Sequence, residues 1–165
     1  ENRLMPDILQ AFAQGEPVVV RSPAARRPWQ HVLEPLRGYL QLAQYLYESD
    51  ECEEAWNFGP NDDDVRSVAN ILDEMVSIWG EKASWMVEEY PDLHEAKLLK
   101  LDSSKAKMKL GWNPIWRLPK TLENIAFWHK SWLAGESARA LCLSDIEEFN
   151  SEIISRANRP TNIKN

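Results

Sequence analysis

Apolar residues recur at intervals of three and four positions in several segments, and this spacing most constrains how the chain can fold. It is the period of an amphipathic α-helix that buries one face. The clearest example predicts a helix over residues 36–47, with its apolar positions at Leu36, Tyr39, Leu40, Ala43, Leu46 and Tyr47. With 44% hydrophobic residues and eight tryptophans, the composition favours a packed globule over a disordered tail.

Glycine, proline and capping residues mark the ends of further helices. One predicted helix begins near Pro6 and stops at Gly15, and a longer one runs from Leu122 to a stop at Gly135. A polar tail from Asn158 follows the last predicted helix. The chain is therefore divided into a folded part over residues 1–157 and a tail over residues 158–165.

Three polar clusters predict where other helices begin. The acidic trio 62–64 is expected to cap a helix that reaches Trp79, because carboxylates are favoured at a helix N-terminus. Cation binding is the alternative for this trio. Ser103 is expected to cap a short helix that ends near Gly111, and residues 144–147 have the pattern of a capping box.

Short β-branched or alternating runs predict strands at residues 17–20, 55–60 and 97–101, and residues 29–32 are expected to be extended. These strands are too scattered to form a large sheet alone. Some are expected to complete a sheet whose other strands lie outside the chain. The predicted fold class is therefore α/β, helix-rich with a few short strands.

The net charge of −7 excludes a general electrostatic footprint for nucleic acid, so any phosphate site has to be local. No apolar run approaches the roughly 20 residues of a membrane span, and no signal peptide is visible. Cys52 and Cys142 lack the spacing of a metal or redox pair, which favours free thiols and a cytoplasmic location.

The sequence lacks the motifs of several catalytic sites. None of its six glycines approaches the GxGxxG spacing of a dinucleotide-binding turn. No tyrosine is followed four positions later by lysine, and neither a serine elbow nor a metal-ligand cluster is present. The chain alone is expected to hold no catalytic residue, no metal and no cofactor.

Residues 26–31, Arg-Arg-Pro-Trp-Gln-His, place guanidinium, indole, amide and imidazole groups just before the 36–47 helix. Such groups suit an anionic aromatic ligand, because guanidinium forms paired hydrogen bonds with phosphate. From the residues alone, a phosphate site and a solvated arginine pair remain equally open. Trp29 fits the core better than a stacking role, and His31 fits a hydrogen-bonded core histidine better than a catalyst.

Several motifs, in the same order along the chain, resemble the CDP-glucose 4,6-dehydratases, a family of extended short-chain dehydrogenases/reductases. The motifs are Asn2-Arg3-Leu4-Met5-Pro6-Asp7, Arg27-Pro28-Trp29-Gln30-His31-Val32, Ala55-Trp56-Asn57-Phe58-Gly59-Pro60, His94-Glu95-Ala96, Leu101-Asp102-Ser103-Ser104-Lys105-Ala106 and Leu110-Gly111-Trp112-Asn113-Pro114. The resemblance runs to about Glu148. Because the chain starts at Glu1 within such a motif, it is expected to be the C-terminal half of a longer enzyme.

The resemblance implies an NAD-dependent lyase that converts CDP-glucose to CDP-4-keto-6-deoxyglucose and water, on the route to dideoxysugars of O-antigen polysaccharide. It also implies a Rossmann-type N-terminal half, outside this chain, with the NAD fingerprint and the catalytic groups. Residues 1–157 would be the substrate-binding part, inactive alone, of a homo-oligomeric parent. A related epimerase or decarboxylase, or a non-catalytic helical binding module, are the alternatives.

The resemblance further implies which residues line the nucleotide-sugar site. Arg27 matches the arginine that meets the diphosphate, and Asn57 matches an asparagine near the phosphates. His94 matches a loop position at the nucleotide. Asn2 and Arg3 match a segment bordering the diphosphate, and Gln30 and Glu95 complete the predicted set.

Overall fold

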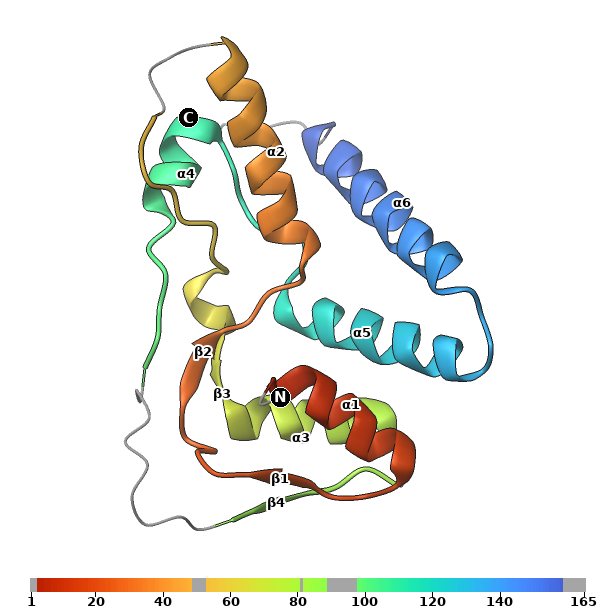
Figure 1. Cartoon of the computed structure of the whole chain (residues 1–165). Coiled ribbons are helices and arrows are strands. Elements are labelled where there is room, and N and C mark those ends of the chain that lie inside the picture. Colours follow the sequence, from red (N-terminus) through yellow and green to blue (C-terminus); the bar gives the residue numbers. More distant parts are fainter. Residues whose placement is uncertain (1–2, 49–52, 81, 89–97, 159–165) are drawn as a thin grey trace.

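The computed structural model describes residues 3–48, 53–80, 82–88 and 98–158, and helices dominate it (Figure 1). The helices are α1 (Leu4–Gln14), α2 (Leu33–Glu48), α3 (Val68–Trp79), α4 (Ser104–Leu110), α5 (Leu118–Leu133) and α6 (Ala138–Ala157), with a 3-10 helix, η2, at Asp62–Asp64. The strands are β1 (Val18–Val20), β2 (Arg26–Pro28), β3 (Val65–Ser67) and β4 (Trp85–Val87). The helix-rich α/β class is confirmed.

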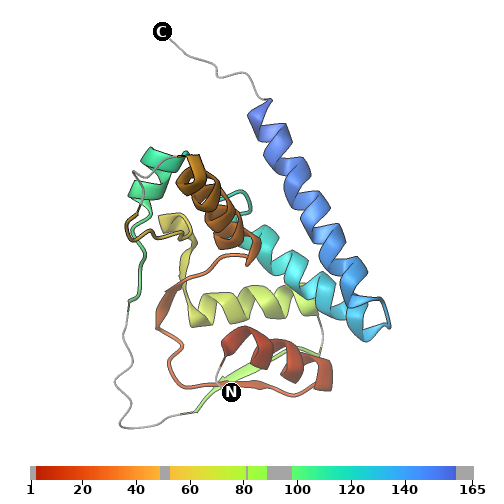
Figure 2. The same ribbon diagram turned by 45° about the horizontal axis from the view of Figure 1, so that its top comes forward.

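One part of the molecule is a layer in which α3 packs on α5 and α1 lies along β1 (Figures 1 and 2). Its core, which we call the α1–α3–α5 core, consists of Ile8, Phe12, Val18, Val20, Ile71, Leu72, Met75, Leu118, Leu122 and Ala126. These side chains are at most 6% exposed. The helix over residues 4–14 ends as predicted, because Gly15 adopts the left-handed conformation with φ 71°.

A second, smaller cluster joins α2 to α4 and consists of Phe58, Ala106 and Trp112; we call it the α2–α4 cluster. The Phe58 ring meets Trp112 edge to face, with ring centroids 5.2 Å apart. It also lies directly against Gly38, where a Cβ atom would come within 2.3 Å of the ring. Glycine is therefore required at this point of α2 for the ring to approach the helix backbone.

The segment between α4 and α5 connects α2 to α6. The buried carboxylate of Glu34 accepts hydrogen bonds from the backbone N–H groups of Ile115 and Trp116. Burial raises the pKa of Glu34, and these hydrogen bonds oppose that rise. Trp116 also meets Phe149 of α6 edge to face at 5.0 Å, so α6 packs against the loop that Glu34 holds.

The strands form two small sheets. β1 pairs with β4 in parallel, and β2 pairs with β3 antiparallel, with Arg27 opposite Arg66. The strand predicted at residues 17–20 is confirmed. The strand predicted at 97–101 is wrong for its described part, where Leu98 makes only an isolated bridge with Arg26.

The strand predicted at residues 55–60 is also wrong, because the described chain forms no ladder there. Side chains form hydrogen bonds with its backbone groups instead. Gln30 Nε2 donates to the Phe58 carbonyl at 2.8 Å, and the Gly59 N–H donates to Ser103 Oγ at 2.7 Å. Lys105 Nζ donates to the Ala55 carbonyl at 2.8 Å. The segment is thus fixed without a strand partner in the chain.

Two predicted helix starts are wrong. The acidic trio forms η2 and not the cap of α3, which is capped by the Ser67 hydroxyl. Asp64 is buried, and the pairing of its Oδ2 with Nε of Arg117 at 2.7 Å compensates the cost of burying its charge. The capping box at 144–147 lies inside α6, whose N-cap is Ser137.

The short helix predicted between Ser103 and Gly111 is confirmed as α4, but its cap differs. Ser103 Oγ is committed to Gly59, and the Asp102 carboxylate accepts the hydrogen bond from the Ser104 N–H at 2.9 Å. The helices predicted over 36–47 and from 122 to 133 are confirmed as α2 and α5. None of the described helices is long and apolar enough to cross a membrane.

Candidate functional site

The basic and aromatic run at residues 26–31 forms β2 and the connection to α2, and cross-strand hydrogen bonds fix it in place. Arg26 Nη2 donates to the Val65 carbonyl at 2.8 Å, and Trp29 Nε1 donates to the Arg66 carbonyl at 3.0 Å. Arg27 lies between these two contacts, half-buried, and its Nη1 donates to the Arg26 carbonyl at 3.0 Å. Arg27 is therefore carried by a strand whose register is held on both sides.

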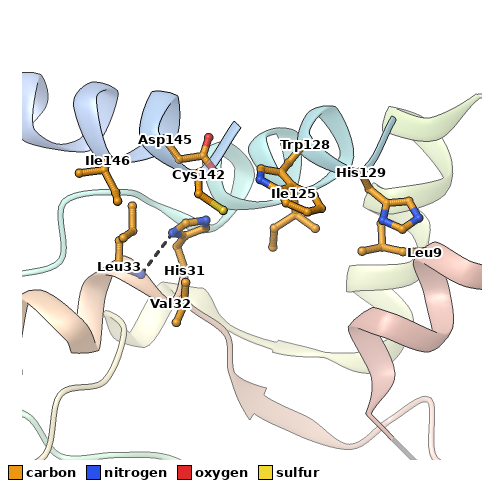
Figure 3. Close-up of a pocket in the computed structure, with 10 residues that line it drawn as sticks. All are labelled: Leu9, His31, Val32, Leu33, Ile125, Trp128, His129, Cys142, Asp145 and Ile146. Carbon is orange, nitrogen blue, oxygen red and sulfur yellow. Dashed lines mark hydrogen bonds between the residues drawn. The ribbon is translucent and has the colours of Figure 1, made fainter. Parts of the chain in front are cut away.

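Trp29 and His31 have structural surroundings. Trp29 packs against the α1–α3–α5 core, in agreement with its predicted core role. His31 is 8% exposed and meets the Trp116 ring at 4.8 Å, edge to face. Its Nδ1 accepts a hydrogen bond from the Leu33 N–H at 3.3 Å (Figure 3). Burial lowers the pKa of His31 to about 4, so the ring is neutral near pH 7, as a core histidine should be.

Gln30 links the strand of Arg27 to the segment of Asn57. Its amide nitrogen donates to the carbonyl of Phe58, the residue after Asn57. Its Oε1 is buried without a hydrogen-bond partner among the described residues. Asn57 is exposed, and its Nδ2 donates to the Asp102 carbonyl at 3.3 Å. Two predicted site residues that lie 30 positions apart are thereby connected through one side chain.

No described contact connects the other predicted site residues with Arg27, Gln30 or Asn57. Arg3 is exposed at the N-cap of α1, where its carbonyl accepts the Asp7 N–H. Asn2, His94 and Glu95 lie outside the described residues. The structure thus connects the segment of Arg27 and Gln30 with the segment of Asn57, and the binding role of every predicted site residue stays a prediction.

A cavity of about 420 Å³ lies beside His31, at the end of the 26–31 run (Figure 3). Its walls are mostly apolar and come from α1, the β2–α2 connection, α5 and α6, with Trp128 and Ile125 among them. Its polar side chains include His31, His129, Cys142 and Asp145, and burial raises the pKa of Asp145. None of the predicted site residues lines it, and no sequence pattern connects its walls.

Sequence reasoning also missed Arg66, which stands directly opposite Arg27 in the β2–β3 ladder. The sequence analysis predicted a helix from the acidic trio onward, which placed residue 66 inside a helix and not in a strand opposite Arg27. Within the described ranges, no three His, Cys, Asp or Glu side chains gather in a way that could hold a metal ion. The chemistry available at the 26–31 run is that of cationic and amide groups, which suits the binding of an anion.

No family model matches the chain. A CDP-glucose 4,6-dehydratase of Salmonella typhimurium is 48% identical over 152 residues, which cover 92% of this chain and 42% of that protein. The chain therefore spans less than half the length of this relative. The resemblance that the motifs predicted is confirmed by this identity.

Solved structures share the fold. A UDP-glucose 4-epimerase superposes with a TM-score of 0.69 at 22% identity, covering 83% of this chain and 43% of that one. A UDP-glucuronic acid 4-epimerase of Bacillus cereus, in complex with UDP-glucuronic acid and NAD, superposes with a TM-score of 0.66 at 19% identity. It covers 79% of this chain and 40% of that one. The fold is thus that of one part of larger nucleotide-sugar enzymes.

Proposed function

The chain belongs to the extended short-chain dehydrogenases/reductases, and on that basis we propose that it is the nucleotide-sugar-binding part of a CDP-glucose 4,6-dehydratase. The observation that carries the proposal is the 48% identity over 92% of the chain to an enzyme of that name. The fixed position of Arg27 on β2 supports it, because a held guanidinium suits a diphosphate.

In the proposed site, Arg27 binds the diphosphate of CDP-glucose and Asn57 donates to its oxygens. Gln30 keeps these two residues together through the Phe58 carbonyl. Asn2, Arg3, His94 and Glu95 would complete the walls around the diphosphate and the nucleotide. Residues 1–157 would form this substrate-binding part, with residues 158–165 as a polar tail.

We assign NAD to the part of the parent enzyme outside this chain. A dinucleotide site needs glycines at a strand-to-helix turn, where the backbone approaches the pyrophosphate. The described glycines with positive φ are Gly15, Gly80, Gly111 and Gly135, and each follows the end of a helix. The described residues therefore do not fit this cofactor, and the chain alone is expected to be inactive.

In the proposed reaction, CDP-glucose loses water to give CDP-4-keto-6-deoxyglucose, a precursor of the dideoxysugars of O-antigen. The acid, the base and the Tyr-x-x-x-Lys pair would lie in the N-terminal half. The task of the present chain is then to bind and orient the substrate. We place the parent enzyme in the cytoplasm, in keeping with two cysteines that lack metal or redox spacing, and as a homo-oligomer.

The exposed face of α2 supports the presence of a missing partner segment. Tyr39, Leu40 and Tyr47 are 56%, 73% and 93% exposed, and Leu36 and Leu46 lie beside them on the same helix face. Such a row of large apolar side chains is unusual on a free surface. We propose that the N-terminal half of the parent enzyme covers it.

Calorimetry on the full-length parent protein tests the proposed function. Wild-type protein should bind CDP-glucose more tightly than UDP-glucose, and Arg27→Ala should weaken CDP-glucose binding roughly tenfold or more, as expected for a lost charged hydrogen bond. A matched control is Arg139→Ala, which removes an exposed arginine from α6. Unchanged affinity in Arg27→Ala would remove this residue from the diphosphate site.

A second candidate is a 4-epimerase or decarboxylase acting on another nucleotide sugar. The observation in its favour is the shared fold with UDP-sugar 4-epimerases. A non-catalytic binding module is a third candidate, favoured by the absence of a dinucleotide fingerprint from the sequence. Products formed by the full-length protein separate these candidates, since only a dehydratase releases water.

A further inference from the structure

Arg66 stands directly across the antiparallel β2–β3 pair from Arg27. Residues opposite one another in such a pair project from the same face of the sheet, with Cβ atoms about 5 Å apart. The two guanidinium groups therefore leave the backbone side by side.

The register that places these arginines together is strongly held. Trp29 Nε1 donates to the carbonyl of Arg66 itself, and Arg26 Nη2 donates to the carbonyl of Val65. Trp29 is in turn packed on the α1–α3–α5 core. A slip that would separate the two charges would break both hydrogen bonds and move Trp29. The fold thus holds Arg27 and Arg66 at neighbouring positions on one face of the strand pair.

The acidic groups near Arg66 do not neutralise it within the described structure. Asp73 and Glu74 of α3 line a polar hollow together with Arg66. Neither forms a salt bridge with Arg66, and Asp73 Oδ1 accepts a hydrogen bond from Trp85 Nε1 instead. Arg66 is exposed, so its guanidinium can turn toward a ligand that lies against Arg27.

We infer that Arg66 is a second arginine of the diphosphate site and that it grips the substrate together with Arg27. A diphosphate carries two adjacent anionic groups, and two planar guanidinium groups from one strand pair can each bind one of them. The identity of the ligand rests on the proposed function, whereas the grip on a diphosphate rests on the β2–β3 register.

The test is calorimetry on the full-length protein with CDP-glucose and with inorganic pyrophosphate, using Arg66→Ala, Arg66→Lys and the control Arg139→Ala. Arg66→Ala should lower the affinity for both ligands roughly ten- to a hundredfold, the range expected for a lost charged hydrogen bond. Arg66→Lys should restore part of the affinity because it keeps the charge and loses the fork. Arg139→Ala should bind like wild type.

Turnover and melting separate a binding role from a structural one. Arg66→Ala should raise KM for the nucleotide sugar and leave kcat near that of wild type. Its Tm without ligand should stay close to that of wild type, because the Arg66 side chain is exposed. A lowered Tm with unchanged affinity would overturn the inference, since Arg66 would then serve only the fold.

The two proposals fail in different ways. If Arg66→Ala binds CDP-glucose as tightly as wild type does, the inference is overturned and the proposed function stands. If wild type binds UDP-glucose and pyrophosphate but not CDP-glucose, and Arg66→Ala weakens both, the diphosphate grip stands and the proposed substrate is wrong. A double variant, Arg27→Ala with Arg66→Ala, should lose less affinity than the sum of the single changes, because both residues hold one ligand.

Discussion

Helices α2 and α5 are both 16 residues long and both carry apolar residues at helical spacing, yet they are used differently. The apolar face of α5 is buried against α3 and α6, with Leu118, Leu122 and Ala126 at most 3% exposed. On α2, only Glu34 and Gly38 are buried, and Leu40 is 73% exposed. The same periodicity thus marks a face that this chain covers and a face that it leaves open. An amphipathic pattern shows that a helix will pack, but it does not show that the partner lies in the same chain.

The largest expected effect on stability is in α5. Leu122→Ala should lower the free energy of unfolding by about 2–5 kcal/mol, because Leu122 is 1% exposed and its removal leaves a cavity among close-packed side chains. Urea unfolding followed by tryptophan fluorescence measures the change. A loss below about 1 kcal/mol would contradict a close-packed α1–α3–α5 core.

The next largest effect on stability is expected at His31, which lies just before α2 and packs on Trp116, just before α5. Its folded pKa of about 4 lies below the unfolded value of 6.5, so its contribution to stability is present above pH 6.5 and is lost as the pH falls toward 4. The loss should reach about 3 kcal/mol relative to His31→Gln, whose side chain does not titrate. Unfolding free energies of both proteins from pH 7 to pH 4 measure it. Parallel pH profiles for the two proteins would show that His31 is not held neutral.

On α2, substitution of the closely packed Gly38 should lower stability, whereas substitution on the exposed face should not. Gly38→Ala should destabilise the protein by about 1–3 kcal/mol, because the added Cβ would lie 2.3 Å from the Phe58 ring. The control is Gly15→Asn at the end of α1, where no atom lies within 4 Å of a Cβ and asparagine tolerates positive φ. Thermal unfolding of both variants checks the difference, and equal melting temperatures would refute the close approach of Phe58 to α2.

The smallest effect is expected on the open face itself. Leu40→Ala should change the stability of this chain by no more than about 0.5 kcal/mol, because its side chain is largely in water. In the full-length protein the same substitution should cost as much as a buried leucine, about 2–5 kcal/mol. The contrast between the two measurements shows whether another part of the parent covers α2. Equal, small costs in both proteins would mean that the face stays open.

Apolar spacing predicted that the helices exist, and Gly15, Gly111 and Gly135 predicted where three of them stop, but the predicted starts of α3 and α6 were wrong. The sequence patterns failed where side chains from distant segments, and not a neighbouring strand, form the hydrogen bonds of the backbone. Residues 55–60 have the composition of a strand, but Gln30 and Ser103 bind their backbone groups from distant parts of the chain. Such contacts depend on tertiary packing and leave no local pattern.

The candidate site residues were predicted from motifs within short segments, and for Arg27 and Asn57 this stays a prediction. The structure adds that Gln30 connects the two segments by its hydrogen bond to the Phe58 carbonyl. Arg66 was missed because its place opposite Arg27 is a matter of strand register. The acidic trio before it also resembled a helix start, whereas burial of Asp64 against Arg117 directs the chain into β3.

The most direct test of the proposed function is product analysis by mass spectrometry after incubation of the full-length protein with CDP-glucose and NAD. We expect a CDP-linked product lighter than the substrate by one water molecule, with a 4-keto-6-deoxy sugar, and its formation should be impaired in Arg27→Ala at limiting substrate. A product of unchanged mass, as from epimerisation, or no reaction with CDP-glucose alongside turnover of another nucleotide sugar, would contradict it.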